Sequence, residues 1–151
     1  MMTYAEVCIR ERQENVTEDY IRGAVWAIMK VYELVPYDRT KTYTERIDMI
    51  LDLEKTFPDY IAAEKESFEF NRGATHGLES FALRVAKDEH LDYGDRLTII
   101  GSYGVDYIAE EEDALQMYQE EFPEGEEKEI SIQNITKKLE WSRNIEKNKS
   151  W

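Results

Sequence analysis

The sequence predicts a mainly α-helical fold, a small helical bundle formed by a single domain over residues 1–151. Only 7 Gly and 3 Pro occur in the 151 residues, and this scarcity favours long helices over many short strands with tight turns. Apolar residues also recur at three- and four-residue steps, which is the spacing of one face of a helix. A chain of this length typically forms one domain and can bury a core without a disulfide or a metal ion.

The clearest predicted helix begins after Thr17, a residue type that caps helix N-termini, and ends before Pro36, which cannot continue the hydrogen-bond ladder. Glu18 and Asp19 fall in its first turn, where the helix dipole favours negative charge. Apolar residues surround much of its circumference, so we expect it to be the central core helix. These residues include Tyr20, Ile21, Ala24, Val25, Ile28, Val31, Tyr32 and Val35. A shorter amphipathic stretch precedes it over 4–14.

The middle of the chain predicts three further helices. Thr42 and Glu45 have the spacing of a capping box and mark the start of the first one. We expect Pro58 to interrupt that helix, because proline lacks the N–H that a helix interior needs. A second helix is predicted over 59–70. After a break at 71–75, the sequence Asn-Arg-Gly-Ala-Thr, a third helix is predicted over 76–90.

The region 91–109 fits two kinds of secondary structure. Residues 96–100, Arg-Leu-Thr-Ile-Ile, have the composition of a strand. Their apolar members, and several residues that follow, also fit helical steps. We favour a helix, because a strand here would need 129–132 as its partner. The alternative is therefore a short two-stranded β element near 96–100 and 129–132.

The C-terminal part of the chain predicts two more helices. The first covers 114–122 and ends at Pro123 and Gly125, which are typical helix terminators. The second is a basic amphipathic tail over 134–151, with apolar residues that include Leu139. Residues 130–151 carry a net charge of +3, from five basic and two acidic side chains.

The cysteine content and the net charge exclude several classes of protein. The single cysteine, Cys8, cannot form an intramolecular disulfide, as is typical of a reducing compartment. No basic start with an apolar run marks a signal peptide, and no window approaches the ~20 apolar residues of a membrane span. The net charge of -14 disfavours direct nucleic-acid binding and adsorption to an anionic membrane. We expect a cytoplasmic protein, in the host cytoplasm if a phage encodes it.

Most of the net charge lies in residues 106–129, named here the acidic segment. It carries 11 acidic side chains and one basic one, for -10 of the total of -14. On a helix, residues 110–113 would place four carboxylates within about 6 Å of axis. Duplex DNA carries a charge about every 1.7 Å of axis, which is a comparable density. Aromatic residues are interleaved with the acids, as they are at many protein interfaces.

We therefore expect the acidic segment to contact a basic protein partner through its carboxylates and two tyrosines. The candidate partner-binding residues are Asp106, Tyr107, Glu110, Glu111, Glu112, Asp113, Tyr118, Glu120 and Glu121. Carboxylates would stand in for phosphates and meet Arg and Lys side chains in charge-assisted pairs. The alternative is a solvated face that only keeps the chain dispersed. In that case Trp141 and Trp151 are the next candidates.

No motif in the sequence fixes a chemistry. His76 and His90 are the only histidines, and Glu79, Asp88, Glu89 and Asp92 lie near them in sequence. These side chains make a metal-dependent hydrolase an alternative from a different class. One histidine at each end of a helix does not make a metal site, however, and neither a phosphate-binding glycine loop nor a nucleophile elbow is present. We expect no enzymatic activity, no cofactor and no metal.

The sequence thus favours a non-enzymatic acidic interaction protein. The more specific hypothesis is an inhibitor that blocks the basic, nucleic-acid-binding surface of a partner. In size, charge and lack of catalytic motifs the chain is similar to the small acidic anti-restriction and anti-CRISPR proteins of phages, which would make it a nucleic-acid mimic. This likeness is one of general character and no sequence motif carries it. The alternative is an immunity or antitoxin protein that plugs a basic nuclease toxin.

Overall fold

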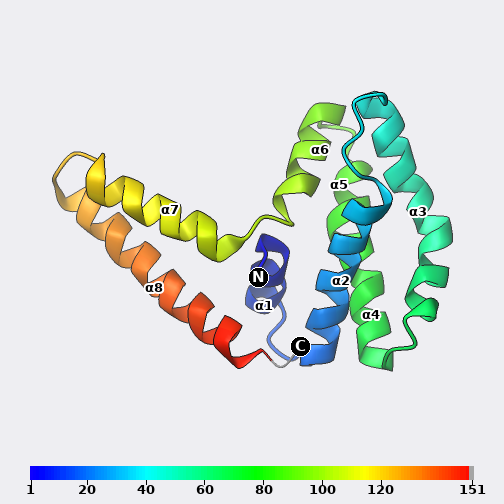
Figure 1. Cartoon of the computed structure of the whole chain (residues 1–151), viewed down its shortest axis with the longest axis horizontal. Coiled ribbons are helices and arrows are strands. Elements are labelled where there is room, and N and C mark those ends of the chain that lie inside the picture. The colour runs from blue at the N-terminus through cyan, green and yellow to red at the C-terminus, as the bar shows by residue number, and fades with distance from the viewer. Residues whose placement is uncertain (150–151) are drawn as a thin grey trace.

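The computed structural model describes residues 1–149, and this part of the chain is mainly α-helical, as predicted. In chain order the helices are α1 (Tyr4–Arg12), α2 (Glu18–Leu34), α3 (Tyr43–Ala63), α4 (Phe68–Gly77), the π-helical turn η1 (Leu78–Leu83), α5 (Arg84–Ala86), α6 (Tyr93–Ser102), α7 (Tyr107–Glu120) and α8 (Glu126–Asn148). Figure 1 shows a body that contains α2 to α6 and an arm made of α7 and α8, with α1 between them.

The predicted helix starts at Thr17 and Thr42 are confirmed. The Thr17 hydroxyl accepts a hydrogen bond from the Tyr20 N–H at 3.1 Å, at the start of α2. Thr42 and Glu45 form a complete capping box at the start of α3, and each side chain accepts from the other residue's N–H at 3.1 Å. Such caps satisfy N–H groups that a first helical turn leaves without a partner. A few local residues therefore fix where these helices begin.

The prediction that Pro58 interrupts a helix is wrong, because α3 continues through it and ends at Ala63. Phe57 and Ile61 lie on either side of the proline and are both buried, so core packing holds the helix together there. Pro58 itself is exposed. Water can therefore solvate the backbone carbonyl that loses its usual N–H partner. The helix predicted over 59–70 is accordingly divided between the end of α3 and the start of α4.

The break predicted at 71–75 is also wrong, because this segment lies inside α4. Gly73 serves helix packing: a Cβ added to it would lie 1.9 Å from the Tyr20 carbonyl oxygen of α2. Gly23 of α2 has the reciprocal role, since its Cβ would lie 2.1 Å from the Phe70 carbonyl oxygen of α4. Glycine at both positions lets the two helix backbones touch.

The strand alternative at 96–100 and 129–132 is not observed. Within residues 1–149 the β-type pairing is limited to one isolated bridge, between Thr3 and Asp106. Residues 96–100 lie in α6 and residues 129–132 lie in α8. α6 packs against α3 and α5 and buries Ile100, which is 4% exposed. The apolar run that resembles a strand is therefore the core face of a helix.

Two helical runs are longer than the sequence predicts. The helix expected over 76–90 is the end of a run that begins at Phe68 and continues from α4 through η1 and α5. The tail expected over 134–151 is part of α8, which already begins at Glu126. The end of the acidic segment and the basic tail thus share one helix. The last two residues of that tail lie outside the described residues.

The core of the body lies where α2, α3 and the helices from α4 to α6 meet. Ile28 of α2, a predicted core residue, is 2% exposed. Trp26 packs against Phe57 and Phe70, with ring centroids 5.7 and 5.6 Å apart. The largest cluster of buried residues comprises Ala27, Val31, Val35, Ile47, Ile50, Leu53, Phe57, Ile61, Phe70, Ala74, Leu78, Ala82, Leu83, Ala86 and Ile100. The body therefore has a core to which the arm contributes nothing.

Replacing Gly73 by alanine should destabilise the protein by about 1–3 kcal/mol or more, because the methyl group would overlap the Tyr20 carbonyl and force α2 away from α4. Urea denaturation followed by circular dichroism measures the change. Gly101→Ala is the control: Gly101 lies in α6, and no neighbouring residue lies within 4 Å of its added Cβ. This control should stabilise by about 0.5–1 kcal/mol. Equal stabilities of the two variants would contradict the close approach of α2 and α4.

Candidate functional site

The acidic segment forms α7, the turn that follows it and the first turn of α8. α7 and α8 pack along each other, and the arm that they form projects away from the body (Figure 1). Both ends of the arm attach to α1 and to the residues before α1. The base of the arm therefore decides where the acidic segment points.

The first attachment holds the start of α7. The Asp106 carboxylate caps this helix and accepts hydrogen bonds from two N–H groups of the first turn, at 3.2 and 3.4 Å. The backbone of Asp106 also pairs with Thr3. The next residue, Tyr107, donates its N–H to the Met2 carbonyl oxygen at 2.7 Å. Asp106 is half-buried, so its main contribution is to position the arm.

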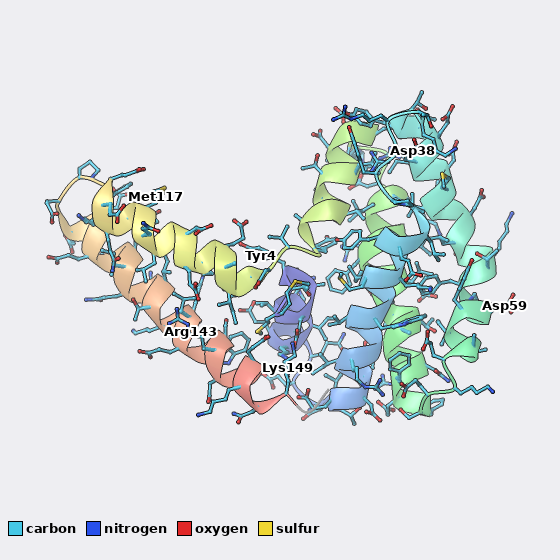
Figure 2. All side chains as sticks on the ribbon, in the orientation of Figure 1. Tyr4, Asp38, Asp59, Met117, Arg143 and Lys149 are labelled. Carbon is cyan, nitrogen blue, oxygen red and sulfur yellow. The ribbon has the colours of Figure 1, made fainter. Side chains whose placement is uncertain are left out.

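The second attachment is a buried ion cluster around Glu6, whose side chain is 0% exposed. Arg10 donates to Glu6 Oε1 at 3.1 and 3.2 Å, and Lys149 donates to Oε2 at 3.0 Å. Glu146 of α8 accepts from the N-terminal ammonium of Met1 at 2.7 Å. Figure 2 labels Lys149 at this junction. The cluster ties the C-terminal end of α8 to α1.

Tyr107 lies inside the base of the arm and not on its exposed face. Its side chain is 5% exposed and packs edge-on against Tyr4, with ring centroids 4.9 Å apart. Burial, and then the negative charge of Glu111, raise the pKa of Tyr107 to about 12. Tyr107 therefore helps to hold the arm, and its ring is not available as a contact surface.

The solvent side of α7 and its C-cap, Glu121, carries four of the predicted carboxylates. Residues three, four and seven positions apart share a helix face, and all four are exposed. This row, named here the outer stripe, consists of Glu110, Asp113, Glu120 and Glu121. Met117 lies among them and is 43% exposed, and Figure 2 labels it on the outer part of the arm. The outer stripe thus combines negative charge with one adaptable apolar side chain.

Two predicted residues lie toward α8 or toward the base. Glu112 pairs with Arg143 of α8 at 3.1 Å, and the two side chains are 50% and 55% exposed. Such a surface pair is worth at most about 1 kcal/mol. Glu111 is half-buried. Burial, followed by the charges of Glu111 and Glu110, raises the pKa of Tyr4, so the negative field of α7 reaches α1.

The tip of the arm combines dense negative charge with a buried lysine. Lys128 is 8% exposed. Its Nζ donates to the Glu124 carboxylate at 2.6 Å and to the Gln119 carbonyl oxygen at 3.2 Å. A cation there stabilises the negative end of the α7 dipole. Tyr118 is half-buried and packs against Phe122, with ring centroids 4.8 Å apart.

The outer stripe has no counter-charge within residues 1–149. No ion pair within 4 Å involves any of its four carboxylates. Glu120 accepts one hydrogen bond from the Gln116 amide at 3.2 Å. On the body, by contrast, Arg22 neutralises Glu66 at 2.6 Å. The arm therefore presents a row of carboxylates that is suited to binding the cationic side chains of another molecule.

The two histidines lie apart and have different surroundings. His76 Nδ1 lies 2.7 Å from the Tyr20 hydroxyl, whereas His90 is exposed in the loop after α5. Among the residues up to Lys149, no group of three or more His, Cys, Asp or Glu side chains is arranged to hold a metal ion. The alternative of a metal-dependent hydrolase thus gains no site from the described side chains.

Comparisons of the chain with protein-family models, with curated proteins and with solved structures give no match. None of the helices described between Met1 and Lys149 has the length and apolar character needed to cross a lipid bilayer. The function therefore has to be inferred from the chemistry of the described side chains themselves.

Sequence reasoning missed the residues that hold the arm in place. Glu6 and Arg10 are four positions apart, a spacing that signals an ion pair on a helix. Nothing local marks Lys149, which is 143 positions from Glu6, as the third member of the cluster. Lys128 carries a clearer signal, because it is the one base among the acids of its segment. A single cation in such a place is expected to be paired.

Replacing Glu6 by glutamine should destabilise the protein by about 1–3 kcal/mol, because Arg10 and Lys149 then lose their buried negative partner, while Arg10 keeps Glu18 and Lys149 keeps Glu146. Urea denaturation measures the loss, and hydrogen exchange should become faster at the end of α8. Glu54→Gln is the control, since it breaks an exposed pair with Lys87 whose side chains are 56% and 51% exposed. The control should change stability by less than about 1 kcal/mol. Similar losses in both variants would contradict the role given to Glu6.

Alkaline pH should destabilise the protein in part through Tyr107. Its folded-state pKa of about 12 lies above the ordinary value of 10.0, so its contribution to stability is complete below pH 10 and is lost as the pH rises toward 12. Tyr107→Phe should therefore flatten the fall in unfolding free energy over this range. Below about pH 9 the two curves should run parallel. If unfolding free energy fell with the same slope in the wild type and in Tyr107→Phe between pH 10 and 12, Tyr107 would ionise as easily in the folded protein as in the unfolded chain.

Proposed function

We propose that this protein is a non-enzymatic inhibitor that binds a basic partner through the outer stripe and thereby blocks a nucleic-acid-binding surface of that partner. One observation carries the proposal. Four exposed carboxylates lie in a row on α7 and its C-cap without an ion pair among the described residues, on an arm that projects from the body (Figure 1). The proposed setting is the cytoplasm, or the host cytoplasm for a phage protein.

The length and charge of the outer stripe support mimicry of a nucleic-acid strand. The axis rises about 16 Å from Glu110 to Glu121, so the three steps between stripe carboxylates average about 5.5 Å, and the longest step runs from Asp113 to Glu120. A single DNA strand carries a phosphate about every 3.4 Å, so about five phosphates span the same length. Arg and Lys side chains that contact phosphates over this length can form the same charge-assisted hydrogen bonds with the stripe carboxylates.

The structure of the free protein also favours such a contact. The carboxylates are held on a formed helix, so little conformational entropy is lost when a partner binds them. No internal ion pair of the stripe has to break first, because none is present within residues 1–149. Repulsion among the carboxylates is relieved when the partner supplies cations. Met117, at 43% exposure, adds an apolar contact that charge alone would not provide.

An immunity protein that plugs a basic nuclease would use the outer stripe in the same way. The two roles differ in the partner: a nuclease toxin encoded beside its immunity protein, or a nucleic-acid-binding protein of the infected cell. The identity of the captured partner therefore distinguishes the two roles, whereas the contact residues are the same in both.

Neutralising the outer stripe should abolish partner binding without unfolding the protein. The stripe variant carries Glu110→Gln, Asp113→Asn, Glu120→Gln and Glu121→Gln. The matched control removes the same number of charges from exposed positions on α3 and its C-cap, with Asp48→Asn, Asp52→Asn, Asp59→Asn and Glu64→Gln. Each form is immobilised and exposed to a lysate of the organism that carries the gene or of its host. Mass spectrometry then quantifies the retained proteins.

At about 50 mM salt the wild type and the α3 variant should retain the same basic protein, and the stripe variant should retain at least about tenfold less. About 500 mM salt should release the partner. The wild-type protein should also displace DNA or RNA from the isolated partner. Equal retention by all three forms, or retention that does not change with salt concentration, would contradict the proposal and would mean that the outer stripe only faces solvent. Trp141, which is 40% exposed on α8, would then be tested next, whereas Trp151 lies outside the described residues.

A further inference from the structure

A pocket of about 210 Å³ lies where α1, α2, the end of α4 and the π-helical turn η1 meet. Its lining includes the buried apolar side chains of Ile9, Ala24 and Phe81. No lining residue belongs to α7 or α8, so the pocket is separate from the outer stripe. A cavity with an apolar floor and a few polar groups around it is the usual form of a small-molecule site.

Two arginines at the rim of this pocket have no partner in the described chain. Arg12 ends α1 and Arg84 begins α5, and both are exposed. Neither takes part in an ion pair within residues 1–149. Arg22 and Arg72, by contrast, bind carboxylates at 2.6 and 2.8 Å. In a chain with a net charge of -14, two such arginines beside one cavity indicate a site for an anion.

The electrostatic field at the pocket agrees with this reading. Burial, and to a smaller extent Cys8, raise the pKa of Tyr103, while Arg12 and Arg84 oppose this increase. The positive charges of both guanidinium groups therefore reach the Tyr103 hydroxyl. Burial raises the pKa of Cys8, and Arg12 again opposes it. Glu11 is the carboxylate that acts on Cys8 in the opposite direction to Arg12. Positive charge from Arg12 and Arg84 and negative charge from Glu11 therefore act on side chains at this end of α1.

Polar groups complete the lining. The Tyr20 hydroxyl and His76 Nδ1 share a hydrogen bond with 2.7 Å between the oxygen and the nitrogen. The other ring nitrogen of His76, Nε2, is then available to a ligand. Ser80 adds a hydroxyl from η1. π-Helical turns are rare and frequently mark functional sites, because they shift the direction of neighbouring side chains.

We propose that this pocket binds a small phosphate monoester, with the phosphate between Arg12 and Arg84 and the apolar part of the ligand on Phe81. Two guanidinium groups on separate helices match the charge of nearly -2 that such a phosphate carries near pH 7. The volume of about 210 Å³ is small for a ligand pocket, which favours a phosphate with one small ring over a dinucleotide. The site would give the protein a ligand that is independent of its acidic arm.

Titration of the ¹⁵N-labelled full chain with phenyl phosphate, followed by amide chemical shifts, tests the assignment. Saturable shifts are expected at Cys8, Gly77 and Ser80, which line the pocket. Arg12→Gln and Arg84→Gln should each weaken binding by at least about tenfold. Arg39→Gln is the matched control, because Arg39 is an exposed arginine outside the pocket. It should bind as the wild type does. The spectrum of each variant shows whether it is folded, and Ser80→Ala provides a milder second variant.

Inorganic phosphate and benzoate separate the contributions of the head group and the ring. Phenyl phosphate should bind more tightly than either of them. The absence of saturable shifts up to about 10 mM phenyl phosphate would overturn the proposal. The same affinity in the Arg12, Arg84 and Arg39 variants would overturn it as well. If benzoate bound as tightly as phenyl phosphate, the assignment to a phosphate monoester would be wrong. None of these outcomes depends on the outer stripe, so the inhibitor role is tested separately.

Discussion

The buried carboxylate of Glu6 is the interaction on which the arrangement of arm and body depends. It accepts hydrogen bonds from Arg10 of its own helix and from Lys149 beyond the end of α8. The start of α7 is held close by, through Asp106 and Tyr107. Inside the arm, the apolar residues of α8 that are buried are Ile135 and Leu139, and so little apolar area alone orients a pair of helices weakly. The direction of the outer stripe is therefore set at the base of the arm.

The arm folds in spite of its charge because the charges are placed favourably. Asp106 caps α7 and Glu110 lies in its first turn, both at the positive end of the helix dipole, and Lys128 stabilises the opposite end. α8 contributes cations alongside α7, as the Arg143 pair with Glu112 shows, and Figure 2 labels Arg143 on that helix. The remaining repulsion falls on the outer stripe and on the first turn of α8, where Glu126, Glu127 and Glu129 are exposed. A cationic partner would convert this repulsion into binding free energy.

Features that depend on neighbours in sequence could be predicted, and features that depend on tertiary contacts could not. The caps at Thr17 and Thr42 involve residues three positions away, so their sequence signal is sufficient. Gly73 and Pro58 were expected to break helices because glycine and proline usually do so. Only the packing of α2 on α4 shows that Gly73 allows a close approach. The acidic charge was visible from composition, whereas its division into capping, buried and exposed carboxylates required the structure.

The central claim is that the outer stripe is a contact surface. Carboxyl footprinting of the complex with the captured partner tests it most directly: exposed carboxylates are converted to amides with a carbodiimide and glycine ethyl ester, and mass spectrometry compares free and bound protein. Glu110, Asp113, Glu120 and Glu121 should be modified readily in the free protein and protected in the complex. Exposed α3 carboxylates such as Asp48 should react equally in both states. Equal modification of the outer stripe with and without the partner would contradict the claim.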